Sequence, residues 1–294
     1  GNFLVAWFNR YGPVYAKKYD INTKTLGDSF EVTPEPDFNA AIQNWPSVAM
    51  QSNGDFIVAW ENYKQSIWSV LPRNKINTRI SFFDSQGNKK PIDIEIPYAL
   101  KPFIIVDDDD NFIVIWKDQK QDGYGSESGL TYAQKYNADG EAIGQKFLTH
   151  SSGDSDSPAQ ISPNGDLVTV WEIHKSSSSD YLNSQRYRPD GTLVGERFVK
   201  EYFLIGYPSI AMNDNGNYVL VWHARFSDSD EYDIYAQRFL SDGTLFREPF
   251  LVSERQGSHV NPSVAIDNDN NFIIVWLSRP KKIGENLDVM AKKY

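Results

Sequence analysis

The chain has 294 residues, of which 29 are basic and 39 acidic, so its formal net charge is −10, and it contains no cysteine. The lack of cysteine excludes a disulfide scaffold, a thiolate metal site and a cysteine nucleophile. Phosphate binding depends on clustered basic side chains that release counterions, so we expect no nucleic-acid partner. No segment approaches the roughly 18 apolar residues of a membrane-spanning helix, so we also expect no membrane insertion.

An internal repeat dominates the chain from its first residues onward. Its most regular element is an apolar run that closes on a tryptophan, and successive tryptophans lie 51 to 56 residues apart. The six tryptophans are Trp7, Trp60, Trp116, Trp171, Trp222 and Trp276. A period near 50 residues is typical of propellers and solenoids.

Each repeat is predicted to contain four strands. The first begins at a proline 13 or 14 residues before the tryptophan, as at Pro46 and Pro208. A turn rich in Asn, Asp and Gly leads to the tryptophan strand, and Asn-Gly is typical of two-residue hairpins because both residues tolerate a positive φ angle. The third strand alternates small or aromatic residues with Gln, Lys or Arg, as at residues 234–239, and an Asp-Gly turn precedes a short fourth strand.

Four hairpin-linked strands in every repeat form one blade of a β-propeller. We therefore predict an all-β fold, a single six-bladed β-propeller domain over residues 1–294 with four-stranded antiparallel blades. A β-solenoid is the competing repeat fold, but its coils are shorter. The first repeat lacks its proline-led strand and the last ends before its fourth strand, so a seven- or eight-bladed ring, or a fragment of a longer array, are alternatives. The predicted repeats cover approximately residues 1–45, 46–101, 102–157, 158–207, 208–261 and 262–294.

The repeat itself resembles a known kind of sequence. Pro-Ser-Val-Ala at residues 46–49 and 262–265, the segment 213–222 and the segment 233–243 resemble the blade repeats of large bacterial secreted and cell-surface proteins. The resemblance covers essentially the whole chain. It implies an extracellular or cell-surface interaction module, either part of a larger polypeptide or a monomer, although this chain shows no signal peptide. It carries no catalytic motif.

The loops after the tryptophan strands are longer than the hairpin turns, and we expect them to share one face of the propeller with the loops that enter each blade. They are predicted to begin directly after the tryptophans, at residues 61–75, 117–129, 172–180 and 223–231. The residues that follow the tryptophans are therefore candidates for this face: Phe8, Glu61, Lys117, Glu172, His223 and Leu277.

Two kinds of enzyme chemistry fit residues of this face. Glu61 and Glu172 have the side chains needed for the acid and base of a glycosidase. A lyase needs a proton-abstracting group near an arginine, and such residues lie in neighbouring loops: His174, His223, His259, Arg225, Arg255 and Tyr202. Solvated charges at the ends of strands explain the same residues without catalysis. If the chain is an enzyme, Glu61, Glu172 and His223 are its candidate catalytic residues.

Two turns place oxygen-bearing side chains at alternate positions, as calcium prefers. They contain Asp107 and Asp109 in one repeat and Asp267 and Asp269 in the last. These turns look like the calcium loops of integrin-type blades but lack the central glycine and a later carboxylate. We expect no cofactor, with calcium at these turns as the alternative.

Two tryptophans, Trp45 and Trp68, fall outside the repeat and on the candidate face. Aromatic side chains are common at protein and sugar contacts, so Trp68 and Trp45, with Lys117 and His223, are the predicted ligand-binding residues. The function predicted from sequence is a non-catalytic recognition module that binds carbohydrate or protein. A polysaccharide-active hydrolase or lyase and a structural spacer are the alternatives.

Overall fold

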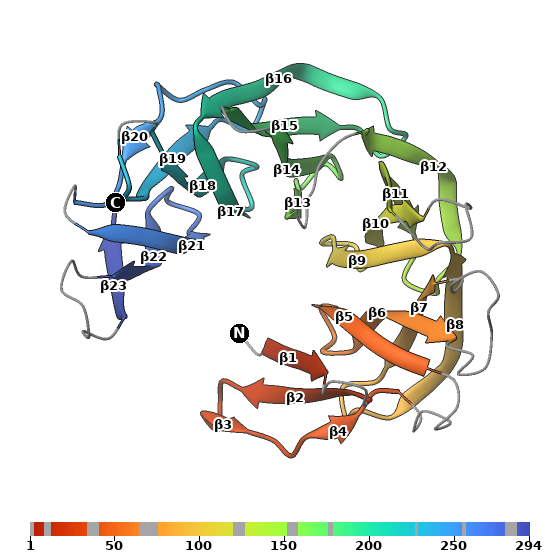
Figure 1. Cartoon of the computed structure of the whole chain (residues 1–294). Helices are drawn as coiled ribbons and strands as arrows, with labels where there is room; N and C mark the ends of the chain where they lie inside the picture. Colours follow the sequence, from red (N-terminus) through yellow and green to blue (C-terminus); the bar gives the residue numbers. More distant parts are fainter. Residues whose placement is uncertain are drawn as a thin grey trace, which may run out of the picture. The chain divides into compact units, whose positions relative to one another are not determined.

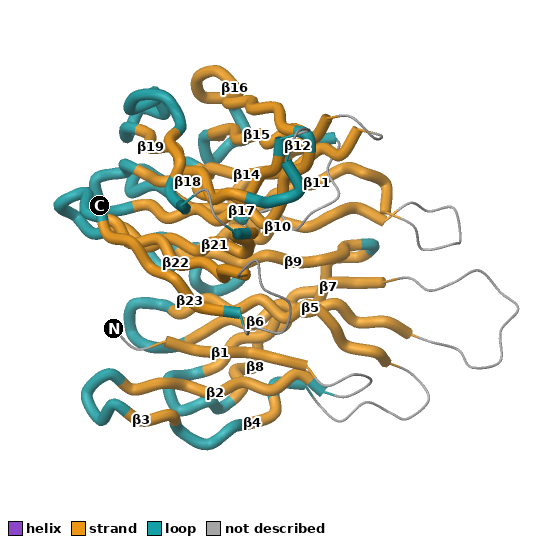
Figure 2. The backbone as a smooth tube through the Cα atoms, turned by 60° about the vertical axis from the view of Figure 1, so that its left-hand side comes forward, coloured by secondary structure: helices purple, strands orange, loops and turns teal. Residues whose placement is uncertain are grey.

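The computed structural model describes residues 3–8, 13–33, 41–64, 76–119, 127–151, 158–175, 179–226, 229–254, 257–279 and 287–294. These residues form 23 β-strands and no helix (Figure 2). None of them therefore belongs to a helix long and apolar enough to cross a membrane. The strands pair into six separate antiparallel sheets, each of which is one blade (Figure 1).

Residues 1–151 form one compact unit with three blades. Blade 1 consists of β1 (Phe3–Phe8), β2 (Val14–Asp20), β3 (Thr25–Leu26) and β4 (Phe30–Glu31). Blade 2 consists of β5 (Ala41–Met50), β6 (Phe56–Lys64), β7 (Ile76–Phe83) and β8 (Lys89–Pro97). Blade 3 consists of β9 (Ala99–Val106), β10 (Phe112–Gln119), β11 (Glu127–Tyr136) and β12 (Ala142–His150).

Residues 152–294 form the second compact unit, also with three blades. Blade 4 consists of β13 (Ala159–Ile161), β14 (Leu167–Lys175), β15 (Ser179–Tyr187) and β16 (Leu193–Tyr202). Blade 5 consists of β17 (Leu204–Met212), β18 (Tyr218–Arg225), β19 (Asp233–Phe239) and β20 (Phe250–Leu251). Blade 6 consists of β21 (Ser258–Ile266), β22 (Phe272–Arg279) and β23 (Asp288–Lys293).

The strand order within the blades is the predicted one. In blades 2 to 6 the proline-led strand pairs with the tryptophan strand, which in turn pairs with the third strand. Among the described residues, blade 1 lacks a proline-led strand and blade 6 lacks a fourth strand, as their sequences predict. The predicted fold class, an all-β six-bladed β-propeller, is confirmed.

The turns between the first two strands differ from the prediction. In the turn of residues 51–55, the amide of Gln51 donates to the carbonyl of Asp55 and the amide of Gly54 donates to the carbonyl of Gln51. The hairpin loop therefore has three residues rather than two. Only its last residue is left-handed: Gly54 has a φ of 86°, and the equivalent Asp110 has a φ of 61°. A type I turn followed by one left-handed residue is the usual form of such a loop.

The repeating tryptophans stabilise contacts between neighbouring blades, as predicted. In the first unit, Trp116 lies in a cluster with Ile80 and Phe82 of blade 2. In the second unit, Trp222 packs with Val170 and Phe198 of blade 4, and a third cluster joins Trp276 to blade 5. Burial of large flat rings between sheets gives a chain without disulfides its hydrophobic core.

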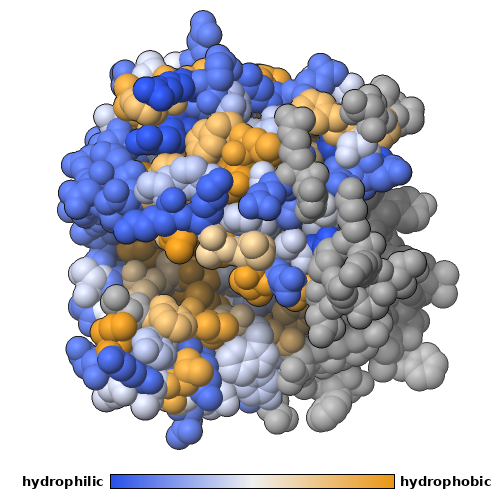
Figure 3. Space-filling view, turned by 90° about the vertical axis from the view of Figure 1, so that its left-hand side faces the viewer, coloured by the Kyte–Doolittle hydropathy of each residue, from blue (hydrophilic) through white to orange (hydrophobic). Residues whose placement is uncertain are grey.

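The surface reflects the acidic, polar composition. Hydrophilic side chains cover much of the face drawn in Figure 3, and hydrophobic side chains lie among them in smaller patches.

Candidate functional site

The tryptophan strands continue past their tryptophans. Strands β6, β10, β14 and β18 each extend three or four residues beyond that position. The predicted loop starts at residues 61, 117, 172 and 223 were therefore wrong. The four side chains at these positions are buried rather than displayed, with 1% exposure for Glu61, 3% for Lys117 and Glu172, and 7% for His223.

A β-bulge interrupts the proline-led strand of four blades at the residue before the proline. The strand register shifts there in β5, β9, β17 and β21. The bulge residues adopt left-handed φ angles of 51° at Trp45, 49° at Lys101, 50° at Tyr207 and 55° at Asn261. Bulges redirect a side chain at strand edges and near binding sites. Three of these residues are exposed: Trp45 by 45%, Tyr207 by 68%, and Asn261.

Three of these buried side chains, those of Glu61, Glu172 and His223, face the bulge of the next blade. The Lys101 amide donates a hydrogen bond of 2.6 Å to Glu61 Oε1, and the Asn261 amide donates one of 3.2 Å to His223 Nδ1. The Tyr207 amide favours the charged form of Glu172 in the same way. Since buried backbone donors require acceptors, this repeat position has a structural role in stabilising the bulges.

Glu172 differs from Glu61 because it also belongs to a cluster of charged side chains. His174 Nε2 lies 3.2 Å from Glu172 Oε2, and His174 Nδ1 lies 3.0 Å from Asp180 Oδ2. Residues 172 and 174 share one face of β14, and His174 pairs directly with Asp180 of β15. The Ile205 amide donates to Asp180 Oδ2. Two buried carboxylates thus hold one imidazole by both of its nitrogens.

Burial sets the protonation of this cluster. The pKa of Glu172 rises from 4.5 to about 7, mainly because of burial; His174 and the Tyr207 amide oppose this rise, and the charge of Asp180 contributes to it. The side chain of Glu172 is 4% exposed and that of His174 is 39% exposed. Glu172 therefore exchanges its proton near neutral pH, and His174 is the member of the cluster that reaches solvent.

The other two candidate histidines are engaged inside the blades. Burial lowers the pKa of His223 to about 4, so this ring is neutral at physiological pH and accepts the Asn261 amide. His259 receives a hydrogen bond from Trp276 Nε1 at Nδ1, and its Nε2 lies 2.8 Å from the Glu254 carbonyl oxygen. Both rings are thus occupied by contacts that support the strands.

The remaining described residues of the predicted lyase set, Arg225 and Tyr202, lie in β18 and β16. The Arg225 guanidinium lies over the rings of Phe203 and Tyr232, at 5.1 Å and 5.7 Å from their centroids. Tyr202 is buried against Trp222. Arg255 lies outside the described residues.

The predicted ligand-binding residues have different settings. Trp45 stands exposed at the bulge of β5, and the Lys101 ammonium lies 5.6 Å from its ring centroid. Lys117 and His223 are buried. Trp68 lies outside the described residues.

The aspartates considered for calcium organise their own turns. Asp107 Oδ1 accepts the amides of Asp109 and Asn111, and its Oδ2 forms a 2.9 Å ion pair with Lys135. Asp267 Oδ1 likewise accepts the amides of Asp269 and Asn271. In the described part of the chain, no group of three or more His, Cys, Asp or Glu residues is arranged to hold a metal ion.

Sequence reasoning missed Asp180 and Tyr207 as members of the candidate site. Asp180 becomes recognisable only when β14 and β15 are paired, since it follows His174 by six positions along the chain. Tyr207 carried a usable signal, because it precedes the proline of its repeat as Trp45 does.

No protein-family model matches this chain, and no curated protein matches it significantly. Solved structures share its fold at low identity. The NanB sialidase from Streptococcus pneumoniae aligns over 98% of this chain and 65% of its own, with 7% identity and a TM-score of 0.57. An ulvan lyase, described as a polysaccharide lyase, aligns over 87% and 71%, with 12% identity and a TM-score of 0.53. At such identities the likeness establishes the propeller fold alone.

Proposed function

We propose that this protein is a polysaccharide-active enzyme whose proton-transfer group is the cluster of Glu172, His174 and Asp180. One observation carries the proposal: a half-exposed histidine is held by two buried carboxylates, one of which has a pKa of about 7. A general acid or base must exchange its proton near the working pH and must reach the substrate. Glu172 meets the first requirement and His174 meets the second.

The cluster suits proton abstraction better than the paired-carboxylate chemistry of glycoside hydrolases. Those enzymes place two carboxyl groups on either side of the sugar bond, whereas the imidazole of His174 fills the space between Glu172 and Asp180. In an elimination, His174 Nε2 gives up its contact with Glu172 and takes the proton next to a sugar carboxylate, while Asp180 holds Nδ1 and stabilises the imidazolium. The released electron pair forms a carbon–carbon double bond as the bond to the next sugar breaks, and the leaving oxygen takes a proton from water.

Carbohydrate is the proposed substrate class because solved structures with this fold include a sialidase and a polysaccharide lyase. The repeat's resemblance to secreted bacterial proteins supports an extracellular or cell-surface location. The choice of residues depends on the geometry of blades 4 and 5 only.

The test is an assay of polysaccharide panels for unsaturated products and for reducing ends. We expect His174→Gln to lose at least about 100-fold in rate, the scale of a general acid or base. Glu61→Gln is the matched control, because Glu61 occupies the same repeat position without a histidine, and it should retain activity. Equal rates in His174→Gln and the parent, with both proteins folded by circular dichroism, would exclude this cluster as the catalytic group.

A non-catalytic binding module is the second candidate, and the exposed Trp45 favours it. Its ring lies under the Lys101 ammonium at a bulge, which gives an aromatic face beside a positive charge. This function predicts glycan-array binding that Trp45→Ala removes, together with no product in either polysaccharide assay.

A further inference from the structure

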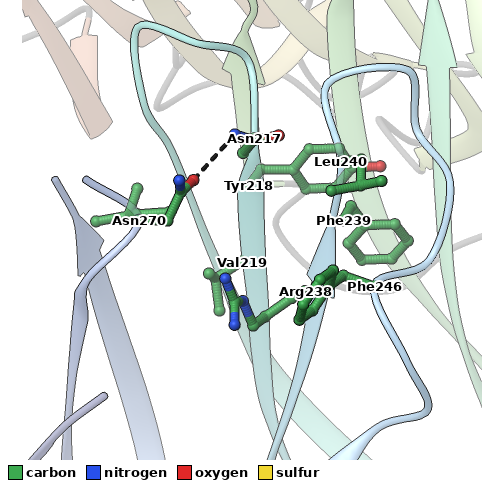
Figure 4. A pocket seen from close by; sticks show the side chains of 9 residues that line it. Asn217, Tyr218, Val219, Arg238, Phe239, Leu240, Phe246 and Asn270 are labelled. Carbon is green, nitrogen blue, oxygen red and sulfur yellow. Dashed lines mark hydrogen bonds between the residues drawn. The ribbon is translucent and has the colours of Figure 1, made fainter. Parts of the chain in front are cut away.

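A small pocket lies in the second unit, at the hairpin-turn ends of β18 and β19 (Figure 4). Its volume is about 130 Å³. Arg238 and Phe246 form one wall, and Asn217 and Asn270 supply amide groups. The pocket opens at the opposite strand end from His223, so it is separate from the Glu172 cluster.

The internal repeat shows what is unusual about Arg238. Arg238 is the third-strand residue that pairs with the second residue of the tryptophan strand, Val219. The residues at the same register position are Lys135 in blade 3, paired with Ile113, and Arg186 in blade 4, paired with Val168. Both equivalents pair with a carboxylate of their own blade's hairpin turn. Lys135 lies 2.9 Å from Asp107, and Arg186 lies 2.8 Å from Asp166.

Blade 5 lacks these carboxylates. Asn213 and Asn217 stand where the other turns have Asp107 and Asp166, at the first and fifth turn positions. Asn270 Oδ1 accepts hydrogen bonds from both amides, at 3.1 Å and 2.9 Å. Arg238 consequently has no ion pair with any residue that the structure describes.

The Arg238 guanidinium instead lies against aromatic rings. It is 4.4 Å from the Phe246 centroid and 5.5 Å from the Phe272 centroid. The Arg247 guanidinium also lies near the Phe246 ring, at 5.6 Å from its centroid. Figure 4 shows Arg238 beside Phe246, with its guanidinium extending toward Val219. Arginine offers a planar fork of donors that fits a carboxylate with two hydrogen bonds.

We propose that this pocket binds a uronate, a six-membered sugar ring that carries a carboxylate. The carboxylate takes the place of the turn aspartate and pairs with Arg238. The ring packs on Phe246 and Leu240, which are 38% and 42% exposed, and its hydroxyl groups meet the amides of Asn217 and Asn270. The pocket is slightly smaller than an engineered cavity of about 150 Å³ that holds benzene, so it takes the carboxylate-bearing edge of the sugar and leaves the rest of the ring on the exposed side chains.

The experiment titrates glucuronate, glucose and benzoate into the full chain by ligand-observed NMR and calorimetry. We expect glucuronate to bind, glucose to bind at least about tenfold more weakly, and Arg238→Gln to weaken glucuronate binding by a similar factor. Arg188→Gln is the matched control, because Arg188 is an exposed arginine in a hairpin turn of blade 4, and it should leave binding unchanged.

A second variant tests the missing carboxylate directly. Asn217→Asp restores the acid at the position of Asp166, so we expect it to pair with Arg238, raise the melting temperature and abolish glucuronate binding. Equal binding of glucose and glucuronate, or glucuronate binding that survives both Arg238→Gln and Asn217→Asp, overturns the proposal. Binding of benzoate without glucuronate overturns the assignment to a sugar. None of these readouts depends on turnover at His174.

Discussion

Glu61 and Glu172 occupy the same position of the repeat, yet their surroundings give them different chemistry. Both are buried after a tryptophan and face a bulge amide of the next blade. Of the two glutamates, only Glu172 has a described contact with a histidine, and that histidine, His174, also contacts Asp180. Because the repeat holds the backbone context constant, the neighbours on the second and third strands of each blade determine whether this glutamate contacts a histidine that reaches solvent.

The pH dependence of stability tests the protonation of Glu172. The folded protein keeps Glu172 protonated up to about pH 7, whereas the unfolded chain releases that proton near 4.5. The stabilisation is therefore fully present below pH 4.5 and is lost as the pH rises through 7. We expect Glu172→Gln to reduce this loss, measured as the free energy of unfolding in urea across this range.

The charges of His174 and Asp180 act on Glu172, so the measured pH step belongs to the cluster rather than to one residue. An unchanged slope in Glu172→Gln would show that the buried carboxyl does not titrate in this window.

The sequence predicted which residues belong to the candidate site better than it predicted their setting. Glu172 and His174 were recognisable as candidates, because they follow a repeat tryptophan in a polar segment. Their burial was not, because nothing in the local pattern shows that β14 continues four residues beyond Trp171. The roles of Asp180 and Tyr207 depend on strand pairing and on the neighbouring blade, which a single local pattern does not specify.

At the scale of the element, the bulges connect the tryptophan strand of one blade to the proline-led strand of the next. In four blades the residue before the proline is left-handed, and the Lys101 and Asn261 amides donate to the side chain that follows the previous tryptophan. The sequence shows the proline and the tryptophan at a fixed spacing. It does not show the bulge, since the preceding residues Trp45, Lys101, Tyr207 and Asn261 share no side-chain chemistry.

Gly206 tests the packing at one bulge. A Cβ at this position would lie 2.7 Å from His223 Nε2, so Gly206→Ala must displace the imidazole that accepts the Asn261 amide. We expect a loss of about 1–3 kcal/mol in the free energy of unfolding, as for other overpacked sites.

Gly27→Ala is the control for Gly206→Ala, because its Cβ would meet only the Lys18 carbonyl oxygen at an ordinary 3.6 Å. It should change stability by less than about 0.5 kcal/mol. Adding His223→Ala to Gly206→Ala should make the two effects non-additive, and additive effects would mean that the methyl group and the imidazole do not compete for space.

For the whole molecule, the repeat period and the strand alternation were sufficient to predict the blades. Blades 2 to 5 share the same order of four strands, so an error in one turn, such as the three-residue hairpin of residues 51–55, leaves the prediction of the blade intact. The repeat pattern does not show whether the whole chain unfolds in one cooperative transition. The sequence predicts one domain, while the chain divides into compact units at residues 1–151 and 152–294.

Paired core substitutions decide how these units unfold. Ile80 in the first unit and Leu220 in the second are fully buried in separate clusters. Ile80→Ala and Leu220→Ala should each cost about 2–5 kcal/mol, because each leaves a cavity. If the chain is one domain, both substitutions lower the same calorimetric transition, and their effects add to within about 0.5 kcal/mol in the double variant. Two transitions, each shifted by only one of the substitutions, would instead make every three-blade unit a domain with its own core.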